Sequence, residues 1–295
     1  MKKVSLVCAL LLLLFASMTA QAQADNVEEQ EEPEIVKFKN LISIKTSLGY
    51  NYMIFQQMSP VALYQTNRPL DFGIGLGIKN IFLGYSMSIP FLYNHNFKKS
   101  QSLDFHLNYY RKEKWFSNGY IKYYNGFNNR TDFDNIDLKI LNIGYLHEFI
   151  TNQDHSIRSV YTLDGKQSAS NGSFLIGGGL FFTSIQSGYD MLDDYAERQN
   201  AFYFGPNFGY SYTFVTRNNF FLNVLATLGA CGIVSGGEFS VGLQILPRVS
   251  AGYHSKTWSM NVAATFSHLL DSYNEEMEYS LISGDINIAF VKRFF

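Results

Sequence analysis

The stretch DFGIGLGIKNIFLGYSMSIP, from Asp71 to Pro90, has glycine at every second position of its first half. Between the glycines stand large apolar residues, namely Phe72, Ile74, Leu76 and Ile78. Side chains of a β-strand point alternately to opposite faces. The stretch therefore predicts a strand with bulky apolar groups on one face and almost no side chain on the other. Lys79 and Asn80 suit a tight reversal into a second strand of the same kind.

The same alternation recurs along most of the chain. It predicts twelve strands, at residues 41–55, 69–79, 80–90, 101–111, 115–127, 136–150, 173–187, 201–215, 219–232, 239–253, 257–270 and 283–295. The facing of 115–127 is ambiguous, and 136–150 has a possible change of facing midway. Most of these segments run to about 10–15 residues, whereas strands of soluble proteins have a mode of about five or six.

The two faces of these strands differ in a way that indicates a membrane. A soluble sandwich also gives apolar and polar faces in alternation. Here, however, the polar faces carry Gly, Ser, Asn and Thr instead of the Lys and Glu of a water-exposed surface. Aromatic residues gather near segment ends, as in the interfacial girdles of barrels. We therefore expect the large residues to face lipid and the small ones to face a crowded lumen.

Composition agrees with this interpretation. Charged residues make up 16% of the chain and aromatic residues another 16%. After the N-terminal region no segment has the eighteen consecutive apolar residues of a membrane-spanning helix. The predicted fold class is all-β, an antiparallel transmembrane β-barrel of about 12 strands, within a range of roughly 10–14. Short connections alternate with longer ones, which places both termini in the periplasm by the usual barrel convention.

The N-terminus predicts export. Lys2 and Lys3 precede an apolar run from Val4 to Ala16, and two overlapping A-x-A patterns end at Ala24. This is the pattern of a secretory signal peptide. We predict a signal peptide at 1–24, an acidic periplasmic tail at 25–40 and an outer-membrane β-barrel at 41–295. The predicted location is the cell outer membrane, with the signal peptide removed.

One segment departs from the strand pattern. Residues Ser156 to Leu163 resemble a strand, and Asp164 and Gly165 resemble a turn. Counting this segment as a strand of the wall would give an odd number, whereas bacterial single-chain barrels have an even one. We interpret the path of 151–173 as a kinked strand or an excursion folded against the wall.

Five stretches carry a resemblance to a known family, in family order over nearly the whole mature chain. They are NRPLDFGIGLG (67–77), SLDFHLNYY (102–110), YYNGF (123–127), KQSASNGSFLIGG (166–178) and GPNFGYSYTF (205–214). With them the chain resembles a family of uncharacterised secreted proteins from Bacteroidetes, the domain of unknown function family numbered 4421. The resemblance implies an outer-membrane β-barrel of unassigned function, with no catalytic or binding residues to transfer. It also implies that residues 166–173 are a family feature.

The sequence indicates no catalytic, cofactor-binding or metal-binding residues and no cofactor. Asp71-Phe72-Gly73 has the letters of a kinase magnesium motif without its companions. The six histidines form no H-x-H or H-x-x-x-H pattern of metal ligands. An outer-membrane lipid hydrolase needs serine and histidine on one face, and no H-x-S occurs within a strand. A cross-strand Ser/His site stays open as an alternative.

We therefore expect an integral outer-membrane protein of unassigned molecular function, either structural or a small-solute pore. The predicted inner face carries both signs of charge, at Lys45, Asp71, Asp104, His106, Gln244, Arg248 and Asp285. Such a mixture does not form the single-sign ring that selects ions. Pairing of these charges across a packed lumen is the favoured interpretation.

The expected partners follow from this location. They are outer-membrane lipid and the outer-membrane insertion machinery, which would bind the C-terminal strand that ends at Phe295. The formal charge of −2 and the lack of a basic stripe argue against nucleic acid. The sequence leaves the oligomeric state open.

Overall fold

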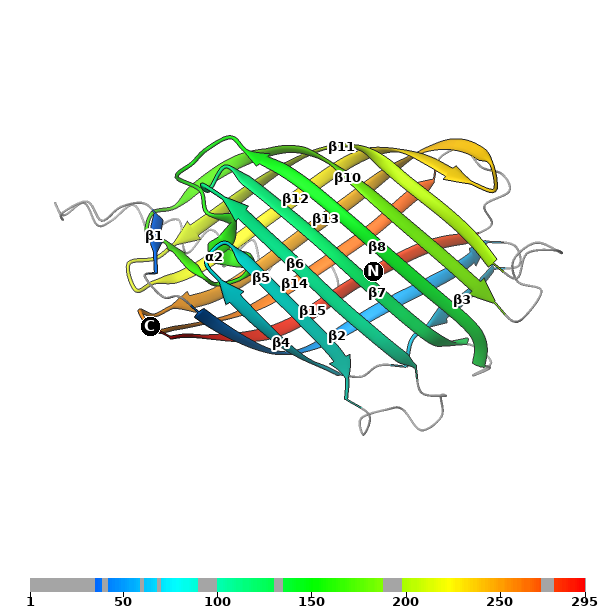
Figure 1. Cartoon of the computed structure of the whole chain (residues 1–295), viewed down its shortest axis with the longest axis horizontal. Coiled ribbons are helices and arrows are strands. Elements are labelled where there is room, and N and C mark those ends of the chain that lie inside the picture. The colour runs from blue at the N-terminus through cyan, green and yellow to red at the C-terminus, as the bar shows by residue number, and fades with distance from the viewer. Residues whose placement is uncertain are drawn as a thin grey trace, which may run out of the picture. The chain divides into compact units, whose positions relative to one another are not determined.

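The computed structural model describes residues 35–38, 42–58, 61–67, 70–89, 100–129, 135–187, 198–271 and 279–294. Twelve of its strands form a closed antiparallel ring (Figure 1). They are β2 (Ile42–Met58), β4 (Asp71–Ile78), β5 (Ile81–Ser88), β6 (Gln101–Arg111), β7 (Trp115–Asn129), β8 (Asn135–Ile150), β10 (Asn171–Ser187), β11 (Arg198–Val215), β12 (Phe220–Ser235), β13 (Glu238–His254), β14 (Trp258–Asp271) and β15 (Tyr279–Phe294). The predicted signal peptide and residues 25–34 of the predicted tail lie outside the described residues.

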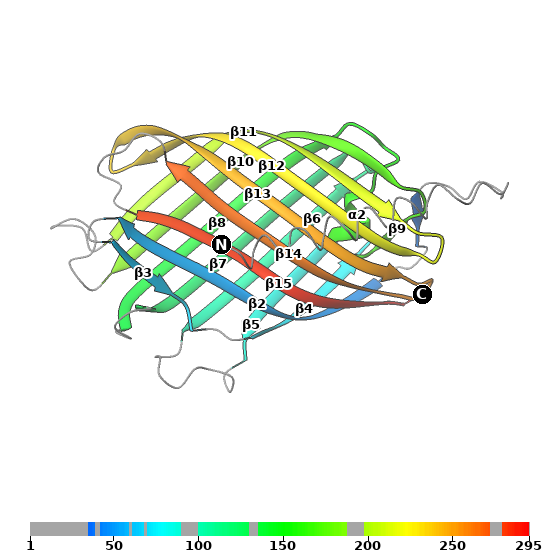
Figure 2. The same ribbon diagram turned by 180° about the vertical axis from the view of Figure 1, so that it is seen from behind.

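The ring closes where β15 pairs with β2. The pairing runs from Tyr279 opposite Gln57 to Phe294 opposite Ile42, and Figure 2 shows the two strands side by side. Because lipid offers no hydrogen-bond partners, a sheet that spans a membrane must close in this way. The predicted all-β barrel of twelve strands is confirmed.

The strand that begins at Asp71 shows why its glycines are there. Buried and exposed residues alternate without a break along β4, and Ile74 is 53% exposed on the outer face. A Cβ atom added at Gly73 or Gly77 would collide with the hydroxyl of a β2 serine, and one at Gly75 would collide with the ring of Phe82. The glycines thus make room for side chains of neighbouring strands inside the lumen.

The ring has two different ends. The connections 79–80, 112–114, 216–219 and 255–257 are tight and lie at one end, called here the turn end. The opposite end, the loop end, carries the connections 59–60, 89–100, 130–134, 188–197 and 272–278, together with a two-residue turn at Gly236 and Gly237. Both of these glycines have positive φ, which favours glycine in such a turn.

A short additional strand, β3 (Val61–Gln65), lies where the sequence predicted only a long connection at 56–68. It pairs with the end of β2 and, through Tyr64 and Gln65, with the end of β7. In the ring, β4, β5 and β6 lie between β2 and β7 and are shorter than both. Beyond the ends of these three strands, β3 pairs with β2 on one side and with β7 on the other. This strand forms because β2 extends to Met58, beyond its pairing with β4, and its edge there is available to β3.

Residues 151–170, called here the plug segment, connect β8 to β10 at the turn end. They contain the helix α2 (Ile157–Tyr161) and the strand β9 (Gly165–Gln167), which pairs with β1 (Ile35–Lys37). Of the two interpretations of this segment, the kinked strand is therefore wrong, and the excursion folded against the wall agrees with the structure. The side chain of Ser156 caps the helix by accepting a hydrogen bond from the Ser159 amide, which overrides the strand preference of Ile157 and Val160.

The lumen is apolar near the loop end under β3. A cluster of buried inward side chains fills this region: Met53, Phe55, Tyr64, Tyr124, Phe127, Leu138, Ile140 and Ile185. At the turn end, Ile157 and Val160 of the plug segment are fully buried among wall residues. Between these two regions the inward residues are mostly polar. Among the described residues, no helix is long and apolar enough to cross a bilayer.

Candidate luminal site

A cavity of about 290 Å³ occupies the middle of the lumen, called here the chamber. Its wall includes all seven inward residues predicted from the sequence, namely Lys45, Asp71, Asp104, His106, Gln244, Arg248 and Asp285. A smaller cavity of about 50 Å³ shares six lining residues with the chamber and includes Thr183, Tyr203 and Cys231. The smaller cavity also contacts the apolar cluster, through Ile185 and Leu281.

Two charged residues of the chamber were missed by the sequence reasoning. Lys122 lies on β7, where a bulge at Gly126 shifts the pairing with β8 between Asn125 and Phe127 and obscured the facing. Glu148 lies on β8, for which the sequence suggested a possible change of facing. Every even-numbered residue from Leu138 to Ile150 nevertheless faces inward, so that change is absent. The sequence misleads because Leu138 and Ile140 are apolar residues inside the lumen, whereas Ile143 and Tyr145 are apolar residues exposed on the outside.

Some of the chamber's charges pair as expected. The imidazole Nε2 of His106 lies 2.8 Å from Asp104, and Lys122 Nζ lies 3.8 Å from the same carboxylate. Asp285 accepts hydrogen bonds from Thr265 and Asn287. Asp71 accepts one from Asn51. These contacts give three of the four carboxylates that line the chamber at least one hydrogen bond or ion pair, although one oxygen each of Asp71 and Asp104 has no hydrogen-bond partner among the described residues.

Two cations of the wall do not pair with carboxylates but contact the plug segment. Lys45 Nζ donates to the carbonyl oxygen of Tyr161 at 3.3 Å. Arg248 Nη2 donates to the carbonyl oxygen of Val160 at 3.4 Å, and its guanidinium lies 4.2 Å from the centre of the Tyr161 ring. Both carbonyls belong to the last turn of α2, where the partial charge of a helix is negative. In the described part of the chain, neither cation has a carboxylate within ion-pair distance.

Glu148 is the fourth chamber carboxylate and differs from the others. Its side chain is 1% exposed, and its Oε1 atom has no hydrogen-bond partner among the described residues. Glu148 also acts on Tyr161, whose phenol has a pKa raised to about 12, mainly by burial; Arg248 lowers this pKa, whereas the charges of Glu148 and Asp285 contribute to the rise. A buried acceptor without a donor is costly, and Glu148 thus brings an unused hydrogen-bond acceptor to the wall of the chamber.

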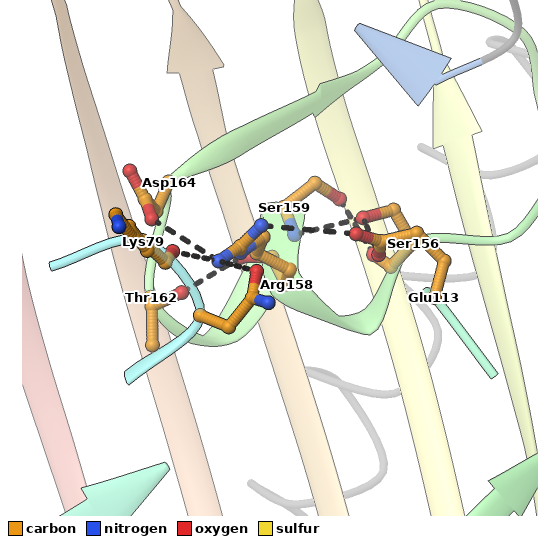
Figure 3. A network of polar contacts seen from close by, with 8 residues as sticks. Lys79, Glu113, Ser156, Arg158, Ser159, Thr162 and Asp164 are labelled. Atoms are coloured by element: carbon orange, nitrogen blue, oxygen red, sulfur yellow. Dashed lines mark hydrogen bonds and ion pairs between the residues drawn. The ribbon is translucent and has the colours of Figure 1, made fainter. Parts of the chain in front are cut away.

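The plug segment is fastened to the turn end by arginine contacts. Figure 3 shows Arg158 at the centre of one network, where it donates to the carbonyl of Lys79 and lies 3.8 Å from Glu113 and 3.6 Å from Asp164. Arg293 of β15 donates to the carbonyl of Leu163 at 2.6 Å. All these contacts are made by side chains, in contrast to the backbone ladders of the wall.

Three serine–histidine contacts answer the question that the sequence left open for a hydrolase. Ser117 Oγ lies 2.8 Å from His147 Nδ1 on the outer face, Ser211 Oγ lies 2.9 Å from His155 Nε2, and Ser259 Oγ lies 2.8 Å from His254 Nδ1. A catalytic triad also needs a group that orients the imidazole. Within the described ranges no carboxylate contacts any of these three histidines, and no group of three metal-ligating side chains is present.

A closed antiparallel ring with an internal plug segment and a polar chamber defines a β-barrel with an occluded lumen. The family model described as "Domain of unknown function (DUF4421)" matches residues 33–294. The chain therefore belongs to this family, as the five sequence stretches suggested. No curated protein matches the chain.

Several solved structures are similar to this chain at low identity. The β domain of the Bordetella autotransporter BrkA is 10% identical, with 86% of this chain and 100% of that chain covered and a TM-score of 0.43. A bacterial polysaccharide outer membrane secretin is 9% identical, with 87% and 99% covered and a TM-score of 0.41. The toluene transporter TodX of P. putida is 8% identical, with 86% and 89% covered and a TM-score of 0.31. The strand pairing itself, rather than these scores, defines the barrel.

Proposed function

We propose that this protein is an integral barrel of the bacterial outer membrane that lets a small polar solute pass when the plug segment moves. The proposal includes removal of a signal peptide at 1–24, periplasmic placement of the turn end and insertion through the C-terminal strand. A Bacteroidetes source is part of it as well, and rests on the sequence resemblance.

The outer face supports membrane placement. Large apolar side chains point outward from every strand of the ring, with exposed fractions of 61% at Leu228, 54% at Ile288 and 53% at Ile74. Soluble monomers rarely expose a contiguous apolar patch above a few hundred Å². Aromatic contacts on the outer face near the turn end, such as Trp258 against Tyr253 and Phe290, match an interfacial girdle.

The observation that carries the proposal is the polar chamber behind the plug segment. A purely structural barrel would be expected to fill its lumen, because buried polar groups without partners are costly. Here a cavity of about 290 Å³ remains, and three residues of its wall, Glu148, Asn142 and Arg248, each have a buried polar atom without a hydrogen-bond partner among the described residues. The plug segment occupies the turn end of the same lumen, so its displacement would open the chamber on that side.

The test is single-channel recording in planar bilayers. We compare the wild type with a variant in which residues 152–170 are replaced by a short Gly/Ser turn. We expect the wild type to be mostly silent and the variant to give stable unitary steps. Arg158→Met should give brief openings, because it removes the contacts to Lys79, Glu113 and Asp164. Heat-modifiable migration on gels confirms that each protein is folded.

A folded variant that lacks the plug segment and stays silent would contradict solute passage and favour a structural role. The hydrolase alternative is measured in the same vesicles as release of fatty acid, with Ser117→Ala as its control. Of the three serine–histidine contacts, the one formed by Ser117 and His147 is on the lipid-facing side, where His147 stacks 4.9 Å from Trp115.

A further inference from the structure

We infer that Lys45, Arg248 and Glu148 form a binding site for a small zwitterion that carries both a carboxylate and an ammonium group, such as an amino acid or a dipeptide. The inference rests on the proposed function and specifies the solute. It also assigns a second role to Lys45 and Arg248. These two cations would bind the carboxylate of the solute, and they also hold the plug segment.

The cationic half of the site consists of Lys45 and Arg248. Both face the chamber, and their charges act on one another. In the described part of the chain, their hydrogen bonds are two long ones, of 3.3 and 3.4 Å, to neutral carbonyl oxygens of α2. The Nε atom of Arg248 is buried without a partner among the described residues. A guanidinium forms its strongest contacts with a carboxylate, through two parallel N–H donors. An anionic group is thus the ligand that this half of the site lacks.

The acidic half of the site is Glu148. It reaches the chamber from β8, whereas Arg248 reaches it from β13, and Tyr161 of the plug segment interacts with both. The carboxylate of Glu148 is buried, and its Oε1 has no donor in the described part of the chain. An ammonium group would supply donors and the opposite charge. The chamber is lined by four carboxylates, but Glu148 is the one for which no hydrogen bond or ion pair is seen among the described residues, and Lys45 and Arg248 have no carboxylate within ion-pair distance there. This set of two cations and one carboxylate favours a zwitterion over a simple anion or cation.

The size of the chamber limits the ligand. Sites for drug-sized molecules measure about 300–1,000 Å³, and the chamber, at about 290 Å³, lies just below that range. A single amino acid or a dipeptide would fit this volume, whereas a long peptide or an oligosaccharide would exceed it.

Ligand binding and plug release would be linked. A ligand carboxylate that takes the donors of Lys45 and Arg248 removes them from the carbonyls of Tyr161 and Val160. The plug segment would then keep its contacts at Arg158 and Arg293 but lose those that face the chamber. A ligand shifts an equilibrium toward the state that it binds better, so a zwitterion in the chamber should favour the displaced plug segment.

Calorimetry on the full chain in detergent micelles tests the site with three matched probes. They are glycylglycine, N-acetylglycylglycine, which lacks the ammonium group, and glycylglycinamide, which lacks the carboxylate. We expect glycylglycine to bind about tenfold more tightly than either of the other two, since each charged contact is worth about one decade of affinity. Equal affinities for the three probes, or no binding, would overturn the inference.

Variants assign the two halves of the site. Glu148→Gln keeps the shape of the side chain and should weaken glycylglycine about tenfold while leaving N-acetylglycylglycine unchanged. Arg248→Met should weaken both carboxylate probes. The matched control is Lys139→Met. Lys139 lies on the outer face of β8, where its Nζ is 3.9 Å from the Asp137 carboxylate, so this variant should bind like the wild type. An unchanged affinity in Glu148→Gln would remove that residue from the site and refute zwitterion recognition.

Hydrogen exchange measures the linkage to the plug segment. Saturating glycylglycine should increase amide exchange in residues 157–163, whereas a ligand that only filled the chamber would decrease it. This outcome is separable from the conductance test, which uses no ligand. If the variant without the plug segment conducts but wild type shows no probe preference, only the zwitterion site fails. If the probe preference holds but that variant is silent, solute passage fails.

Discussion

Replacing Ile286 by arginine would place a charge on the lipid-facing side of β15. Ile286 is 52% exposed and stands between Ala264 of β14 and Tyr50 of β2, near the middle of both pairings. An arginine at the bilayer midplane of a transmembrane barrel costs about 2–4 kcal/mol. We expect Ile286→Arg to lower the free energy of unfolding by that amount.

The next residue provides the matched control. Asn287 points to the opposite face, lines the chamber and donates a hydrogen bond to Asp285. In Asn287→Arg that hydrogen bond is lost, but the new guanidinium lies beside the Asp285 carboxylate in a polar cavity. We expect a loss of about 1 kcal/mol or less, because the ion pair offsets much of the lost contact.

Urea unfolding from lipid vesicles, followed by the fluorescence of Trp115 and Trp258, measures both variants. The prediction depends on the difference between them and not on either value alone. Similar losses in both variants would refute the assignment of lipid and lumen faces on β15. A negligible loss in Ile286→Arg would refute contact with lipid, since a water-exposed arginine carries no such cost.

Three further predictions test other parts of the molecule. Burial lowers the pKa of His155 from 6.5 to about 4, so the unfolded chain binds the proton more tightly than the folded chain. The stabilising contribution of His155 should therefore be constant above pH 6.5 and fall by up to about 3 kcal/mol toward pH 4. Urea titrations of His155→Gln should show that this dependence on pH is lost. Deleting Phe294 and Phe295 should sharply reduce the amount of protein in outer-membrane fractions while export continues, because Phe294 pairs with Ile42 at the ring closure; normal yield of a heat-modifiable truncated protein would contradict recognition of the final strand. Single cysteines at Asn94, Asp193 and Glu276, in connections outside the described residues, should react with an impermeant maleimide on whole cells, whereas one at Asn218 in the turn end should not; the reverse pattern would invert the proposed orientation.

The wall of the barrel was predictable because one physical constraint acts on every residue of it. A strand between lipid and a crowded lumen must alternate large apolar and small or polar side chains, and β4 shows this over Asp71 to Ile78. The same alternation identified seven chamber residues before the structure was known. Strand ends were less accurate: β12 runs to Ser235 rather than 232, because the tight turn at Gly236 and Gly237 lets the hairpin continue.

The plug segment was not predictable from the same pattern, because its structure depends on tertiary contacts. Ile157, Val160 and Tyr161 have the residue types of a strand. They form a helix because the lumen buries them on all sides and because Ser156 and Thr162 provide polar groups at its two ends. Lys122 was missed because the bulge at Gly126 shifts the pairing of β7 with β8, and Glu148 was missed because apolar residues occupy both faces of β8.

The contrast between wall and plug segment explains why the plug segment is the part expected to move. Each wall strand is held by backbone hydrogen bonds to two neighbours, and in a membrane no solvent can replace those bonds. Among the described residues, the plug segment has a three-residue ladder between β1 and β9, and its other contacts with the wall are mostly hydrogen bonds of side chains, including those of Arg158, Arg293, Lys45 and Arg248. Regions with few backbone ladders open at lower free energy than the rest of a structure. Because two of the four cations also face the chamber, a change inside the chamber acts directly on the least stable element of the lumen.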